Sequence, residues 1–174
     1  GPQGTGVLLC RDRARPIMAG GTGSESRNQA MPETLPDALE AGTHNIPGIA
    51  GLLAGLRYVK RRGLESIDAH ERKLKGLMCR KLAGISGLEV FSSPTAQAGV
   101  VSVRSGKLGS EEIAAALGAR GVAVRAGLHC APLAHQSAGT LEGGTVRFSF
   151  SPFNNAAEID RAAAELVRIL KMSS

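Results

Sequence analysis

The chain has 174 residues, enough for one domain or for one domain with part of another. Apolar residues make up 43% and charged residues 21%, which is ordinary for a folded globular protein and argues against wholesale disorder. The net charge of +6 raises the question of nucleic acid, but the densest basic run, residues 60–62, ends a helical pattern and complements the helix dipole there. Because neither interleaved aromatic residues nor a DNA-binding signature accompanies this run, we expect no nucleic-acid partner.

The three cysteines, Cys10, Cys79 and Cys130, lack paired spacing, so neither a disulfide framework nor a zinc site is predicted. No metal-binding histidine motif is present either, and we expect no metal. The longest apolar run is far shorter than a membrane span, and no charged-then-apolar leader opens the sequence. These features predict a protein without membrane contact in a reducing, cytoplasmic setting.

Residues 1–44 are rich in turn-forming residues and show little periodicity beyond a strand-like apolar run at residues 7–10. Such a stretch is too irregular to form a domain by itself. A helical pattern begins at Asn45, a predicted cap, with Pro47 in the first turn, and it ends at Gly63. We therefore expect a single helix to follow an irregular opening segment.

The remainder of the sequence alternates helical and strand patterns. In order, we expect a helix around Ile67–Leu82, strands at Glu89–Phe91 and Val100–Val103, a helix capped by Ser110 and ending at Gly118–Gly121, strands at Val122–Arg125 and Thr145–Phe150, and a helix over Ala156–Met172. This order is typical of an α+β fold, in which helices pack on a small sheet. Between the last two strands, residues 126–144 form a long Gly-rich loop of the kind that often carries function.

The chain around the beginning of that loop, residues 125–132, reads Arg-Ala-Gly-Leu-His-Cys-Ala-Pro and contains Cys130. A reactive cysteine must be an accessible thiolate and benefits from nearby positive charge, which Arg125 and His129 can supply. The usual alternative is a buried cysteine that acts as a small hydrophobic residue. That alternative suits Cys10 and Cys79, whereas Cys130 lies in a loop. From the residues alone, a reactive and a structural Cys130 both stay open.

Arg125 and Arg147 lie near strand ends on either side of the loop. The planar guanidinium group is a natural partner of a carboxylate, so this pair points to an acid or amino-acid ligand. Solvated charges at strand ends would give the same pattern. The segment Glu40–Asn45 precedes a helix N-terminus, where free amides favour an anion, although simple capping explains it equally well.

Together, these segments resemble the cysteine desulfurase family within the class V aminotransferase-like pyridoxal-phosphate enzymes. The resemblance runs nearly end to end and comprises the opening Gly-Pro-Gln-Gly-Thr-Gly, Gly20–Ser24, Glu40–Thr43, Asn45–Gly48, Arg125–Pro132 and Thr145–Asn154. It is strongest in Arg-x-Gly-x-His-Cys-Ala and the later Val-Arg-x-Ser. It implies the small C-terminal α+β domain of a pyridoxal-phosphate-dependent transferase at residues 63–174, a linking helix at 45–62, and the tail of the large α/β cofactor domain at 1–44.

The resemblance also implies roles for individual residues. Cys130 would take sulfur from L-cysteine as a persulfide, and alanine would be released. Arg125, Arg147 and His129 would form the substrate site. Gly42 and Thr43 would contact the phosphate of pyridoxal 5'-phosphate across a homodimer. Sulfur would then pass to an acceptor protein, for iron–sulfur cluster assembly.

The departures from the family pattern set limits on this reading. In the family, the lysine that forms the Schiff base precedes the opening turn, and no lysine of this sequence has the matching context, so we expect the chain to be inactive alone. One alternative is another class V lyase or aminotransferase, such as a selenocysteine lyase. Another is a non-catalytic sulfur-relay or dimerisation module.

Overall fold

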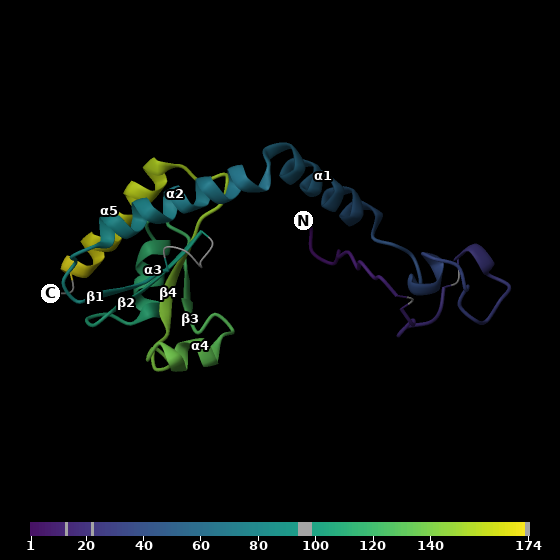
Figure 1. Cartoon of the computed structure of the whole chain (residues 1–174). Coiled ribbons are helices and arrows are strands. Elements are labelled where there is room, and N and C mark those ends of the chain that lie inside the picture. Colours follow the sequence, from purple (N-terminus) through teal and green to yellow (C-terminus); the bar gives the residue numbers. More distant parts are fainter. Residues whose placement is uncertain (13, 22, 94–98, 173–174) are drawn as a thin grey trace. The chain divides into compact units, whose positions relative to one another are not determined.

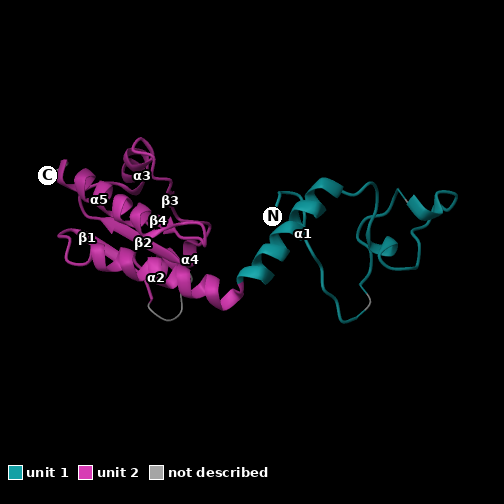
Figure 2. Cartoon of the chain, turned by 90° about the horizontal axis from the view of Figure 1, so that it is seen from above, with its two compact units in different colours: residues 1–62 teal, residues 63–174 magenta. Residues whose placement is uncertain are grey.

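The computed structural model describes residues 1–12, 14–21, 23–93 and 99–172. The chain forms two compact units, Gly1–Arg62 and Gly63–Ser174, shown in different colours in Figure 2. None of the helices in these described ranges is long and apolar enough to span a membrane.

The first unit holds two short 3-10 helices, Gly23–Glu25 and Asp37–Leu39, and one long helix, α1 (Ile46–Arg62). The expectation of a strand at residues 7–10 is wrong: this run is exposed and forms no strand. A strand needs a neighbouring strand to pair its backbone groups, and the described part of this unit contains none.

Helix α1 begins as its sequence predicts. The backbone N–H of Gly48 donates a hydrogen bond of 3.0 Å to Oδ1 of Asn45, which caps the helix. Two glycines of α1 also leave room for the opening of the chain, because a side chain at Gly48 would collide with Thr5 and one at Gly51 with Pro2. These glycines let the first residues lie directly on the helix.

The second unit contains the rest of the elements (Figure 1). They are α2 (Leu64–Leu82), β1 (Leu88–Phe91), β2 (Val100–Ser105), α3 (Ser110–Gly118), β3 (Arg125–Gly127), α4 (Pro132–Ser137), β4 (Thr145–Ser149) and α5 (Ala156–Met172). The strands form one sheet in the order β1-β2-β4-β3, and each neighbouring pair is antiparallel. The predicted α+β fold class, a small sheet with packed helices, is confirmed.

One face of the sheet carries the core, and the strand alternation decides which face that is. Val146 and Phe148 of β4 are buried beneath the helices, whereas Arg147 between them belongs to the opposite face. The core consists of Leu74, Met78, Leu82, Val101, Val103, Ile113, Leu117, Val146, Phe148, Ile159, Ala162, Ala163, Leu166, Ile169 and Leu170. It is therefore built from α2, α3 and α5 packed on β2 and β4, and the opposite face is left for polar side chains.

Two details differ from the sequence-based expectations. Strand β3 begins at Arg125, not at Val122, because the N–H of Val122 closes the end of α3 on the carbonyl of Leu117 and does not pair with β4. The loop expected at 126–144 contains the end of β3 and the short helix α4, which starts with Pro132 at its first position.

The N-terminus of α3 also differs. Ser110 is the first helical residue, and Gly109 is the cap, with its N–H donated to Oε2 of Glu112 at 2.8 Å. The hydroxyl of Ser110 donates instead to the carbonyl of Gly143, which ties α3 to the turn before β4.

Candidate active site

Arg125 and Arg147 lie opposite each other in the β3–β4 ladder, on the sheet face away from the core. Arg125 is exposed and Arg147 half-buried. Nε of Arg147 is a buried donor with no hydrogen-bond partner among the described residues. Because two adjacent guanidinium groups with an unused donor favour an anion, this face is suited to a carboxylate.

Cys130 lies five residues after Arg125, on the turn that follows β3. Its side chain is exposed, and Nη2 of Arg125 lies 3.8 Å from Sγ. A guanidinium group at this distance attracts a sulfur that carries negative charge. Accessibility and charge, the two requirements of a nucleophilic thiol, are therefore both met at Cys130.

The turn that presents Cys130 has an uncommon backbone. His129 has φ 53° and Cys130 φ 60°, and they are the non-glycine residues with positive φ in the described chain. Such conformations cost roughly 1–3 kcal/mol each and persist only where the surroundings hold them. The N–H of Ala131 closes the turn on the carbonyl of Leu128 at 2.9 Å, immediately before α4 begins. Strain at a candidate nucleophile is the pattern expected of a functional site.

The ring of His129 lies in a polar cluster with Thr145 and His135. Nε2 lies 3.1 Å from Oγ1 of the buried Thr145, and the ring centroid lies 5.6 Å from that of His135. Burial lowers the pKa of His129, and its electrostatic interactions with Arg147, His135 and Arg125 lower it further. The imidazole is therefore neutral near pH 7. Of the two residues expected to bring positive charge to Cys130, Arg125 supplies it and His129 does not.

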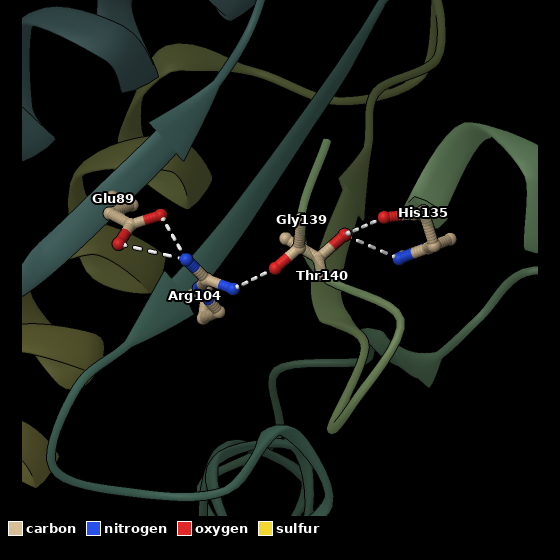
Figure 3. Close-up of polar contacts among 5 residues, drawn as sticks. All are labelled: Glu89, Arg104, His135, Gly139 and Thr140. Carbon is tan, nitrogen blue, oxygen red and sulfur yellow. Dashed lines mark hydrogen bonds and ion pairs between the residues drawn. The ribbon is translucent and has the colours of Figure 1, made fainter. Parts of the chain in front are cut away.

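Further residues of this cluster carry no recognisable sequence signal. His135 of α4 is buried, and its Nδ1 lies 2.8 Å from Oγ1 of the buried Thr140. Arg104 of β2 donates to the carbonyl of Gly139 at 2.6 Å (Figure 3). These residues are brought together by strand register and by α4, so sequence reasoning missed them.

Gly42 and Thr43 belong to the first unit. The N–H of Gly42 donates to the carbonyl of Gly21 at 3.2 Å, and a side chain at Gly21 would lie only 2.7 Å from Cα of Gly42. The adjoining open cleft has a volume of about 580 Å³ and is lined by Gly20, Gly21, Gly23, Ser26, Asn28, Gln29, Gly42 and Thr43. The N–H of Gly42 is used within the chain, but the small lining residues leave room for a phosphate group, and the hydroxyl of Thr43 can donate to one.

The model of the aminotransferase class-V family matches residues 1–162. The chain therefore belongs to this family. Among curated proteins, it is 35% identical to a probable cysteine desulfurase of Xylella fastidiosa over 99% of its length and 42% of that protein. It is 38% identical to probable cysteine desulfurase 1 of Mycobacterium leprae over 92% of its length and 27% of that protein.

Solved structures agree. The cysteine desulfurase CsdA of Escherichia coli matches with a TM-score of 0.79 at 26% identity, over 91% of this chain and 39% of CsdA. An apo cysteine desulfurase of Thermococcus onnurineus NA1 matches with a TM-score of 0.77 at 30% identity, over 90% of this chain and 40% of that one. The resemblance to cysteine desulfurases is thus confirmed over nearly the whole chain, which spans less than half the length of these relatives.

Proposed function

We propose that this chain provides the sulfur-accepting part of a pyridoxal-phosphate-dependent cysteine desulfurase. The observation that carries the proposal is the exposed thiol of Cys130, held on a strained turn with a guanidinium group 3.8 Å from its sulfur. The relatives and the solved structures at 26% and 30% identity bear the name cysteine desulfurase, which supports this function over a lyase or aminotransferase acting on another amino acid.

In the proposed reaction, Cys130 acts as the nucleophile. Its thiolate forms a bond to the sulfur of L-cysteine, and the bond between that sulfur and the substrate's Cβ breaks. The electron pair stays with the carbon fragment, which takes up a proton and leaves as alanine. Cys130 retains the sulfur as a persulfide, so the net change is thiol plus cysteine to persulfide plus alanine.

Arg147 and Arg125 would bind the carboxylate of the substrate. The unused Nε donor of Arg147 supports this role, since a carboxylate would satisfy it. Arg125 would also hold the thiolate before attack. The neutral, half-buried ring of His129 would serve the site by supporting the turn next to Cys130.

The cofactor would be pyridoxal 5'-phosphate, with its phosphate on Gly42 and Thr43. The close packing of Gly21 against Gly42, and the small residues around them, support this fit. When bound, the cofactor supplies an electron sink that weakens the bond between carbon and sulfur in the substrate. We assign its covalent anchor to no lysine of this chain, and we propose that the phosphate site is completed in a homodimer.

The persulfide would be passed to a sulfur-acceptor protein. We propose that this transfer takes place in the cytoplasm and serves iron–sulfur cluster assembly. The exposure of Cys130 supports this proposal, because an acceptor thiol must reach the terminal sulfur.

The test uses the complete product of the gene, loaded with pyridoxal phosphate and exposed to L-cysteine. Mass spectrometry of proteolytic peptides then locates the persulfide, while alanine release is followed in parallel. We expect a persulfide on Cys130 that is lost, together with alanine, in Cys130→Ser but kept in the matched control Cys79→Ser. Alanine release that continues in Cys130→Ser would overturn the proposal.

A further inference from the structure

The turn at His129 and Cys130 needs a support outside itself, because two successive left-handed residues are costly. We propose that Arg104, on the distant strand β2, is a positioning residue that holds this turn, and with it Sγ of Cys130, through α4. An effect of Arg104 on catalysis rests on the proposed function, whereas the contacts that hold the turn all lie among described residues of the second unit. Glu89, Arg104, Gly139, Thr140 and His135 are named here the anchor network (Figure 3).

The side chain of Arg104 is held in place by neighbouring residues of the sheet. Its Nη2 donates to both carboxylate oxygens of Glu89 on β1, at 3.0 and 2.8 Å, and its guanidinium carbon lies 6.0 Å from the ring centroid of Phe91. These contacts orient the guanidinium plane, so that Nη1 points to the carbonyl of Gly139 at 2.6 Å. The sheet thereby holds the turn that follows α4.

Thr140, the next residue after Gly139, contacts α4. Thr140 follows Gly139 directly and is almost fully buried, with 1% of its surface exposed. Its N–H donates to the carbonyl of His135 at 2.8 Å, and its Oγ1 lies 2.8 Å from Nδ1 of the same histidine. With a backbone and a side-chain bond on one residue, the ring of His135 has little freedom to move.

The ring of His135 contacts the ring of His129 in the strained turn. Its ring is tilted by 49° against that of His129 at 5.6 Å, and His129 is held on the other side by Thr145 of β4. His129 is thus held between α4 and the sheet, and Cys130 is its neighbour in the chain. The position of Sγ near Arg125 therefore depends on contacts that begin on β1 and β2.

Loss of Arg104 should affect the reaction rate more than the stability of the protein. The side chains of Arg104 and Glu89 are 34% and 58% exposed, and ion pairs this open contribute little to stability. Loss of Arg104 should consequently change the melting temperature little. A displacement of Sγ by about 1 Å, in contrast, is enough to slow a reaction on the order of tenfold or more.

The experiment compares Arg104→Gln with Arg72→Gln in the complete gene product. Arg72 forms an ion pair of similar exposure with Asp68 on α2, outside the anchor network, so its loss is a matched control. The rate at which iodoacetamide alkylates Cys130, followed by mass spectrometry without L-cysteine, reports on the thiol directly. We expect this rate to fall in Arg104→Gln, because Sγ then loses the guanidinium group that attracts its negative charge, and to stay unchanged in Arg72→Gln.

The decisive readout is a double-mutant cycle with Arg125→Gln. If Arg104 keeps Sγ beside Arg125, then Arg125→Gln slows alkylation in the parent protein but adds little in the Arg104→Gln background. Additive effects of the two changes, or an unaltered rate in Arg104→Gln, would overturn the inference. Should Arg104→Gln fail to fold, Thr140→Val takes its place, with Thr140→Ser expected to restore the rate; equal rates in both would also overturn it.

Steady-state kinetics of the holoenzyme with L-cysteine adds the catalytic meaning. We expect kcat to fall in Arg104→Gln while KM changes less than twofold, since Arg125 and Arg147 remain. If the parent protein forms no persulfide on Cys130, the proposed function fails, whereas the alkylation cycle still decides whether Arg104 positions the thiol.

Discussion

Arg125 and Arg147 are paired across β3 and β4, so their guanidinium groups leave the sheet side by side on the face opposite α2, α3 and α5. Both charges also lie close enough to His129 to lower its pKa. The same pair thus makes an anion-binding face and keeps the neighbouring imidazole neutral. The polar face of the small sheet can accordingly bind a carboxylate next to the nucleophile without placing a third positive charge there.

Arg147→Gln should weaken substrate binding more than it slows chemistry. Hydrogen bonds to charged groups contribute roughly 1.5–3 kcal/mol, so we expect KM for L-cysteine to rise about tenfold to a hundredfold, with a smaller change in kcat. Arg147→Lys should be intermediate because lysine lacks the planar fork. Arg168→Gln, which removes an exposed arginine paired with Glu165 on α5, is the matched control, and an unchanged KM in Arg147→Gln would refute the assignment.

Gly144→Ala should destabilise the second unit and disturb the turn after β3. A Cβ at Gly144 would lie 2.6 Å from the carbonyl group of Gly127, and φ is 62° there. Gly143 has φ 92° but open space around it, so Gly143→Ala tests the backbone strain alone. We expect urea unfolding to show a loss of about 1–3 kcal/mol for Gly144→Ala beyond that of Gly143→Ala. Equal losses would mean that the close contact is easily relieved.

His129 should make the protein less stable in mild acid. Because its pKa is lowered from the ordinary 6.5 in the folded state, the unfolded chain takes up the proton first as pH falls. The stabilisation due to neutral His129 is complete above about pH 6.5 and is lost below it. Urea unfolding at pH 7.5 and 5.5 should show a smaller drop for His129→Gln than for the parent protein. His44→Gln, in the first unit, serves as the control, and an identical drop in His129→Gln would contradict the prediction.

Helix α5 should depend on a capping box at its start. The N–H of Asn155 donates to Oε2 of Glu158 at 3.0 Å, and the N–H of Glu158 donates back to Oδ1 of Asn155 at 3.1 Å. Hydrogen bonds from Asn154 and Asn155 lower the pKa of Glu158. The stabilisation that its carboxylate gives to the folded state is therefore lost as pH falls through this lowered pKa. We expect Asn155→Ala to cost about 1 kcal/mol in thermal or urea unfolding, and Asn155→Asp to retain most of the stability. A cost of the same size for both variants would rule out the cap.

The sequence by itself was sufficient to predict those helices, strands and caps that have a strong local pattern. The apolar period of α5, the alternation along β4 and the cap at Asn45 all appear in the structure where the residues predict them. Each of these signals depends on contacts within a few residues, or on which face of one element is apolar. The α+β class followed from the order of such elements, and Cys130 and Arg125 stood out because of their residue types in one loop.

Only the tertiary structure decided how the candidate site is held. The left-handed turn at His129 and Cys130 has no local sequence requirement comparable to a glycine, and the short helix α4 lies within a loop of weak periodicity. The contact between Arg104 and Gly139 joins residues 35 positions apart. Such contacts arise from strand register and from the packing of the chain on the sheet, which no single segment encodes, so they became visible only when the sheet was assembled.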